Sequence, residues 1–252
     1  MSGHSKWATT KHRKAAQDSK RSALFSKLSR NITVAAKEGG DPNPDNNAAL
    51  AAAITKAKGY SLPKDKIESA IKKAFGSGSD GANYETVVYE GYGPAGVAFY
   101  CEALTDNRNR TAADVRSAFT HSGGNLGTSG SVAFQFERKG QIIIDKAQCE
   151  DEDELMMAVA EAGGDDYEDA EDEWIIYTEF TALNDVRIAL GEQGIEIKGA
   201  EPIMQPTNPT QVSVADARKV MRLVDRLEDL EDIQNVYNTM DITDEIAAAL
   251  EE

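Results

Sequence analysis

The stretch Gly76-Ser-Gly-Ser-Asp-Gly81 divides the sequence into two regions with different hydrophobic patterns. Glycine and serine form flexible connections, so this stretch predicts a linker between domains. Before it, apolar residues recur with the period of helices, and after it they form short β-rich runs with occasional helices. The sequence therefore predicts an α+β multidomain fold, in which an N-terminal three-helix domain precedes two α/β domains.

Three helices are predicted before the linker. Leu28 and Ile32 share one apolar face of the first helix, and Gly39-Gly40 ends it. A second apolar face runs from Leu50 to Ala57. A third helix begins at Pro63, because proline suits the first helical position.

Strands dominate the pattern after the linker. We expect strands at 85–92 and 97–104, a helix that starts with Thr111 and Asp114 in a capping box, and a strand at 131–137. Residues 140–198 follow the order β-α-β-β-α-β, which is that of the ferredoxin-like fold. A strand at 211–214, a helix at 215–228 and a strand at 233–237 then complete the domain that the ferredoxin-like segment interrupts. The predicted division is a flexible basic arm at 1–22, a helical domain at 23–80, a discontinuous α/β domain at 81–139 plus 206–252, and an inserted ferredoxin-like domain at 140–205.

Charge is distributed very unevenly along the chain. The net charge of the 252 residues is −16, yet residues 1–80 hold 15 Lys and Arg against 7 Asp and Glu. The remaining residues hold 12 basic and 36 acidic side chains. A basic segment joined to an acidic body is typical of proteins whose basic part binds a polyanion.

The bulk composition indicates a cytoplasmic protein. No apolar stretch approaches the ~18–20 residues that span a bilayer, and the first residues do not form a secretory signal. Cys101 and Cys149 lie far apart and are interpreted as free, reduced thiols.

The basic arm offers the strongest candidate chemistry. Lys and Arg neutralise phosphates, and the indole of Trp7 can stack on an unpaired base. The alternative is an unspecific basic tail. The candidate nucleic-acid-binding residues are Lys6, Trp7, Lys11, His12, Arg13, Lys14, Lys20 and Arg21 in and next to the arm, Lys27 and Arg30 on the first helix, and Lys64, Lys66, Lys72 and Lys73 on the third.

A second polar site is the stretch Asp106, Asn107, Arg108, Asn109 and Arg110. It follows a predicted strand and precedes a helix, and loops at such points often carry function. Its arginines and asparagines suit phosphate or base-edge contacts. A structural turn and cap network is an equally good interpretation.

Nothing in the sequence predicts an enzyme, a cofactor or a metal site. Gly91-Tyr-Gly-Pro-Ala-Gly96 matches the dinucleotide-binding pattern, but a strand rather than a helix follows it, so we expect a hairpin turn. The acidic runs 150–154 and 165–173 lack the spacing of a calcium loop. His121 has no partner at the spacing of a catalytic triad.

Several motifs together resemble the YebC/PmpR family over the whole chain. They are Ser2-Gly-His-Ser-Lys-Trp7, Lys11-His-Arg-Lys-Ala-Ala-Gln-Asp18, Gly39-Gly-Asp-Pro42, Leu62-Pro-Lys-Asp65, Tyr89-Glu-Gly-Tyr-Gly-Pro94, Leu104-Thr-Asp-Asn-Arg-Asn-Arg-Thr111, Gly123-Gly-Asn-Leu-Gly127 and Gly130-Ser-Val-Ala-Phe134. The resemblance implies three domains, no catalytic residues and no cofactor. It also implies a DNA-binding transcriptional regulator or, as the alternative, a ribosome-associated translation factor that binds ribosomal RNA and relieves stalling on proline-rich sequences.

Overall fold

The computed structural model describes residues 19–76, 84–149, 151–170 and 172–251, which form two compact units. The first unit comprises Met1–Ala23, Gly81–Glu137 and Met204–Glu252, and the second comprises Leu24–Asp80 and Arg138–Ile203. The second unit thus groups the predicted helical domain with most of the predicted insertion. The four predicted segment boundaries therefore stay predictions.

A four-stranded sheet is the centre of the first unit. Its strands are β1 (Glu85–Tyr92), β2 (Ala98–Thr105), β3 (Asn125–Leu126) and β8 (Ile233–Asn238), in the spatial order β3-β1-β2-β8. β1 is antiparallel to β2 and to β3, and β2 is antiparallel to β8. The single 3₁₀ turn η1 (Pro94–Gly96) joins β1 to β2, so the expected hairpin at the glycine-rich stretch is confirmed.

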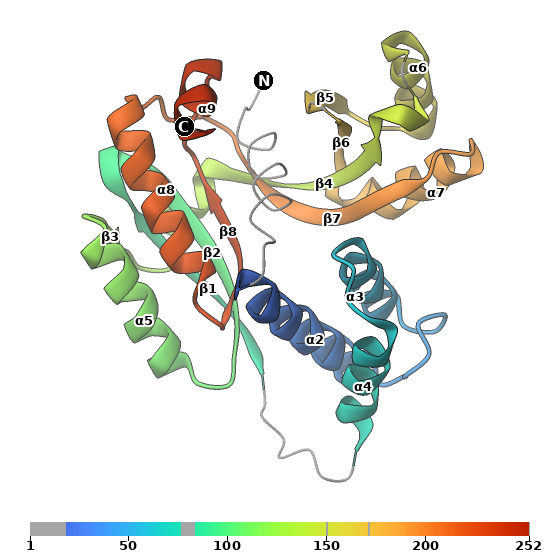
Figure 1. Ribbon diagram of the computed structural model, residues 1–252, viewed down its shortest axis with the longest axis horizontal. Coiled ribbons are helices and arrows are strands. Elements are labelled where there is room, and N and C mark those ends of the chain that lie inside the picture. The colour runs from blue at the N-terminus through green and yellow to red at the C-terminus, as the bar shows by residue number, and fades with distance from the viewer. Residues whose placement is uncertain (1–18, 77–83, 150, 171, 252) are drawn as a thin grey trace. The chain divides into compact units, whose positions relative to one another are not determined.

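Helices cover one face of this sheet (Figure 1). They are α5 (Arg108–His121), α8 (Val214–Glu228) and α9 (Asp244–Glu251). Phe99 of β2 and Phe119 of α5 are fully buried and meet edge to face, with ring centroids 5.7 Å apart. Leu223 and Leu227 of α8 join the same core. Each such side chain contributes roughly 1.5–3 kcal/mol by leaving water.

The predicted strand at 131–137 is wrong for most of its length. Residues Ala133–Gln135 form the 3₁₀ turn η2, and β4 (Phe136–Asp145) begins only at its end. The cause is Glu90, whose buried carboxylate accepts hydrogen bonds from the backbone N–H groups of Val132 and Ala133. Backbone groups bound to a side chain cannot also form a strand ladder.

Two further predictions in this unit are wrong. The stretch 211–214 is not a strand, because Thr210 forms only an isolated bridge with Met240 and α8 begins at Val214. The capping box is also misplaced. Asn107 caps α5, and Thr111 lies inside the helix, where its hydroxyl is buried.

The helical part of the second unit contains most of α2 (Ser19–Gly39), together with α3 (Ala48–Gly59) and α4 (Lys64–Phe75). α2 begins at Ser19, within the segment expected as an arm. Buried Asn47 ties two helices together: its Oδ1 accepts from Leu50 N to cap α3, and its amide donates to Ala35 O of α2. The core of this part comprises Leu28, Ile32, Ala36, Leu50, Ile54, Ala57, Leu62, Ile67 and Ala70.

The second sheet has the ferredoxin-like order. Its elements follow one another as β4 (Phe136–Asp145), α6 (Glu152–Ala162), β5 (Asp166–Ala170), β6 (Glu173–Glu179), α7 (Leu183–Glu192) and β7 (Ile197–Pro206), with short turns η3 (Lys146–Gln148) and η4 (Phe180–Ala182). The spatial order is β5-β6-β4-β7, so the first and third strands lie in the middle. Leu155 of α6 and Leu190 of α7 pack on Ile142 and Ile176 of the two central strands.

The predicted fold class is therefore confirmed. Three N-terminal helices precede two four-stranded sheets, and the strands of the ferredoxin-like sheet fall between β3 and β8 in the sequence. The second sheet is in this sense inserted into the first. No helix within the described ranges combines the length and the apolar character needed to cross a membrane.

Candidate nucleic-acid interface

Six of the candidate residues lie outside the described residues: Lys6, Trp7, Lys11, His12, Arg13 and Lys14. Lys20 and Arg21 lie in the first turn of α2, without a description of their side chains. The nucleic-acid contacts expected of all eight stay predictions.

α2 carries Lys27 and Arg30 on the side opposite its buried residues Leu28 and Ile32. Both basic side chains are half-buried, and both take part in contacts within the protein. They are therefore less available to a ligand than the helical period alone suggests.

α4 presents its four lysines to solvent. Lys64, Lys66, Lys72 and Lys73 are all exposed, and within the described residues only Lys64 is near a carboxylate, with Nζ 3.9 Å from Glu68 Oε1. Lys66 and Lys73 are seven residues apart, so they lie two turns apart on the same side of the helix. Lys72 and Lys73 also occupy the last turn, where positive charge stabilises the helix dipole. Lys72 and Lys73 therefore stabilise the end of α4 and also expose positive charge to solvent.

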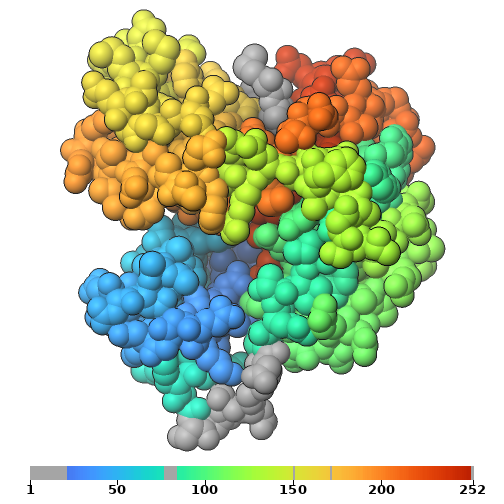
Figure 2. Space-filling model, turned by 180° about the vertical axis from the view of Figure 1, so that it is seen from behind, coloured from blue at the N-terminus to red at the C-terminus, as the bar shows by residue number. Residues whose placement is uncertain are grey.

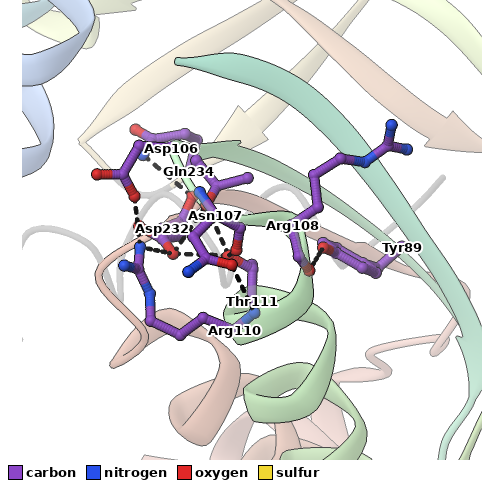
Figure 3. Close-up of polar contacts among 9 residues, drawn as sticks. Tyr89, Asp106, Asn107, Arg108, Arg110, Thr111, Asp232 and Gln234 are labelled. Carbon is purple, nitrogen blue, oxygen red and sulfur yellow. Dashed lines mark hydrogen bonds and ion pairs between the residues drawn. The ribbon is translucent and has the colours of Figure 1, made fainter. Parts of the chain in front are cut away.

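The second polar site is built around Asp232, which follows α8 (Figure 3). Asn107 caps α5 by accepting a hydrogen bond from Arg110 N at 3.1 Å. The guanidinium of Arg110 donates to Asp106 and to Asp232, both at 2.8 Å. The hydroxyl of Thr111 donates to the same Asp232 oxygen at 2.7 Å.

These contacts shift the pKa of two groups. Burial acts to raise the pKa of Asp232, but hydrogen bonds from Arg110 and Thr111 and the charge of Arg110 outweigh it and lower that pKa. The hydrogen bonds to Asp232 and Asp106 raise the pKa of Arg110. The positive charge of Arg110 is thus compensated by two carboxylates within the protein.

The five residues of this site consequently fall into two groups. Asn107, Arg110 and Asp106 are engaged in the cap network described above, which supports the structural interpretation for them. Arg108 and Asn109 are exposed, and Nη1 of Arg108 lies 3.6 Å from Oε2 of Glu85. A phosphate contact from these two stays a prediction.

In the first unit the basic residues are concentrated on two helices, a feature that the sequence interpretation missed. In the ranges 84–137 and 204–251, all seven Lys and Arg lie on α5 or α8, beside only four acidic residues. The other twelve acidic residues in these ranges lie elsewhere. Arg218, Arg222 and Arg226 are exposed at four-residue intervals on α8, so successive arginines are about 6 Å apart along the axis. Counting charges by helical face would have found this stripe.

The described residues contain no group of three or more His, Cys, Asp and Glu that suits a metal ion. Burial raises the pKa of the Cys101 thiol, so this buried cysteine is a poor nucleophile. Desolvation and then the carboxylates of Glu154 and Asp151 raise the pKa of Cys149 as well. The ring nitrogen Nδ1 of His121 lies within hydrogen-bond distance of Ser117, one turn earlier in α5.

Comparison with known proteins gives matches along the whole chain. The TACO1/YebC protein N-terminal domain matches residues 5–77, and the TACO1/YebC second and third domain matches residues 84–240. A probable transcriptional regulatory protein of Bifidobacterium longum is 51% identical over 252 residues, which is 100% of both chains. One of the same name from Rubrobacter xylanophilus is 50% identical over 248 residues, or 98% of each chain. The crystal structure of a conserved hypothetical protein from Aquifex aeolicus superposes with a TM-score of 0.80 at 42% identity, over 88% of this chain and 91% of that one.

Proposed function

Because this chain belongs to the TACO1/YebC family, we propose that it is a cytoplasmic, nucleic-acid-binding regulator of gene expression, acting as a DNA-binding transcriptional regulatory protein. The relatives named above are called probable transcriptional regulatory proteins, and that name describes no class of enzyme. It supports a regulator that works by binding rather than by catalysis.

The exposed lysines of α4 carry this proposal. Lys66, Lys72 and Lys73 have no ion-pair partner among the described residues, in a chain whose net charge is −16. Ammonium groups that face solvent can neutralise phosphates and release their counterions, which drives association with nucleic acid. The predicted arm adds further positive charge to the same N-terminal region.

The acidic remainder of the chain affects which part of the protein a nucleic acid approaches. Its carboxylates repel a polyanion, so a nucleic acid approaches through the basic N-terminal region. At physiological ionic strength such repulsion acts over about 8 Å. The acidic parts of the surface therefore resist unspecific binding of a polyanion.

The alternative function is a ribosome-associated translation factor that binds ribosomal RNA and relieves stalling on proline-rich sequences. The composition of α4 favours it equally, because the helix exposes lysines and no Arg, Asn or Gln that reads base edges. Lysine contacts position a protein on a phosphate backbone without specifying a sequence. Either DNA or structured RNA can bind to such a surface.

The test is a double substitution, Lys66→Gln with Lys73→Gln, in the full-length protein. The logarithm of the affinity falls with the logarithm of the salt concentration, with a slope of about −0.9 for each phosphate contact on duplex DNA. We therefore expect the loss of two contacts to make this slope shallower by about 2. The measurement is fluorescence anisotropy of labelled duplex DNA and of structured RNA at several salt concentrations. Lys219→Gln is the matched control, because Lys219 pairs with Asp216 at 2.8 Å on α8.

An unchanged slope in the double variant would remove α4 from the interface. Deletion of residues 1–22 tests the arm in the same assay, and there we expect most of the affinity to disappear. Crosslinking in cells, followed by sequencing of bound DNA and bound RNA, separates the two functions. Promoter enrichment supports the transcriptional regulator, and enrichment of ribosomal RNA supports the alternative.

A further inference from the structure

The connection between α5 and β4 is built on one buried carboxylate. Glu90 of β1 is 4% exposed, and its two oxygens accept hydrogen bonds from the N–H groups of Gly130, Val132 and Ala133 at 2.7–2.8 Å. The N–H of Gly127 donates to the Glu90 carbonyl oxygen at 2.7 Å. Hydrogen bonds to a buried charge are strong and leave little freedom, so they hold this loop in one conformation.

The loop presents an aromatic ring to solvent. Phe134 is 74% exposed, although the residues on both sides of it are anchored. The backbone N–H of Ala133 donates to Glu90, and the side-chain amide of Gln135 donates to the hydroxyl of Tyr92 at 3.0 Å. The loop therefore fixes the backbone at Phe134 while leaving its ring uncovered.

Tyr92 is the second exposed aromatic residue at this place. It is 39% exposed, and its hydroxyl lies 3.3 Å from the carbonyl oxygen of Ser131. Among residues 84–137 and 204–251, Tyr92 and Phe134 are the only large hydrophobic side chains that are exposed. The yellow-green segment of the chain, to which this loop belongs, lies on the face shown in Figure 2.

The surroundings of Phe134 suit a nucleobase better than a protein. Residues 125–135 include no charged side chain, and apart from Phe134 their exposed members are small or polar. A protein interface of this kind usually needs a contiguous apolar patch of a few hundred Å². A base needs only one aromatic face and no exposed carboxylate beside it that repels its phosphate. The carboxylate of Glu90 is buried, and both of its oxygens are bound by backbone N–H groups of the loop.

We propose that Phe134, held by the Glu90-anchored loop and accompanied by Tyr92, is a stacking platform for an unpaired nucleobase. This inference rests on the proposed function, because it adds a base contact to a protein that binds nucleic acid. It assigns the first unit a direct role in binding single-stranded or looped segments. The phosphate contacts of the basic helices are independent of it.

The test compares Phe134→Ala with the wild-type full-length protein. The probes are a labelled single-stranded oligouridylate and oligothymidylate, with a DNA strand of the same length in which abasic residues replace the bases. Stacking on one aromatic side chain supports a loss of about tenfold in affinity for the strands that carry bases. Affinity for the abasic strand and the salt slope should not change, because the substitution removes no charge.

Two further variants complete the design. Phe134→Trp should retain affinity, and the fluorescence of the added indole should be quenched by strands with bases and not by the abasic strand. Phe180→Ala is the matched control, because Phe180 is also an exposed aromatic residue but lies under the guanidinium of Arg138, 3.9 Å from its ring centroid. We expect no change in affinity for this control.

The outcomes separate the two proposals. Equal affinity of Phe134→Ala and wild type for all strands, with salt-dependent binding intact, overturns the stacking platform alone. An equal loss on abasic and base-containing strands also overturns it, because the ring then contacts no base. Absence of wild-type binding to every strand and duplex overturns the proposed function together with the platform.

Discussion

Replacing Asp232 with alanine removes the carboxylate on which three side chains from the start of α5 and the end of β2 converge. One oxygen of Asp232 accepts from the Thr111 hydroxyl at 2.7 Å, from Arg110 at 2.8 Å and from the Thr105 hydroxyl at 3.2 Å. In Figure 3 these contacts join α5 to the segment that precedes β8. We expect Asp232→Ala to destabilise the fold and to leave nucleic-acid binding intact.

The magnitude follows from burial. The Asp232 side chain is 8% exposed, and Thr105 and Thr111 are almost completely buried. A hydrogen bond to a charged group contributes roughly 1.5–3 kcal/mol, so at the lower end of this range the loss of the two threonine contacts costs about 3 kcal/mol. Arg110 is half exposed, and solvent screens its ion pair, so we assign it no part of this figure.

The assay is thermal unfolding followed by circular dichroism. For a chain of this length, a loss of about 3 kcal/mol lowers Tm by roughly 6–12 °C. Asp241→Ala is the matched control, because the side chain of Asp241 has no hydrogen bond or ion pair within the described part of the chain. Its Tm should stay near that of the wild type.

Two results would refute this reasoning. A Tm equal to that of the wild type would show that the Asp232 contacts contribute nothing to stability. A folded Asp232→Ala protein with weakened affinity for nucleic acid would show that the residues from Asp106 to Arg110 belong to the interface. The second result would support the phosphate-binding interpretation of that stretch.

Two other predictions concern stability. The pKa of Asp232 is lowered in the folded protein, so its contribution to stability is complete above the unfolded value of about 3.9 and is lost as pH falls through the lower folded value. The difference in unfolding free energy between wild type and Asp232→Asn, measured with urea from neutral to acid pH, should therefore begin to shrink below about pH 4 and vanish only below the folded pKa. A constant difference would contradict the assignment. Leu223→Ala in the α5–α8 core should cost roughly 2–5 kcal/mol in the same urea assay, because Leu223 is fully buried, whereas a cost below about 1 kcal/mol would mean that the core collapses around the cavity.

The order of helices and strands could be predicted because its signals are local. Gly163 ends α6 in the left-handed conformation, with φ of 86°, and Asp151 caps its start. Such signals, combined with the hydrophobic period, were sufficient for the ferredoxin-like order of β4 to β7. The family resemblance read from sequence motifs is likewise confirmed by matches over the whole chain.

The errors arose where a distant side chain decides the local structure. The stretch 131–137 alternates like a strand, but Glu90, some forty residues earlier, binds its N–H groups. Thr111 resembles an N-cap residue, but Asp232, 121 residues later, draws its hydroxyl into the interior. No pattern within a short window contains either partner.

The candidate site, like the fold, could be predicted only in part from the sequence. The helical period of α4 correctly placed its lysines in solvent, because each stands clear of the buried face defined by Ile67 and Ala70. The half-burial of Lys27 and Arg30 could not be predicted, because it depends on contacts that α2 makes within the folded protein. The exposure of Phe134 was equally hidden, since a phenylalanine in a β-like run is expected to be buried.

Charge and base recognition make different demands, and the two proposals assign them to different residues. The lysines on α4 would act through a field that salt screens, so their contribution would weaken as ionic strength rises. A ring such as Phe134 acts through contact, which salt hardly affects, and it works only where the nucleic acid leaves a base unpaired. A fully paired promoter offers no such base, whereas folded RNA offers many in loops and bulges. A stacking contribution from Phe134 would therefore favour the RNA-binding alternative over binding to intact duplex DNA, and the oligonucleotide experiment on this one side chain bears directly on the choice between them.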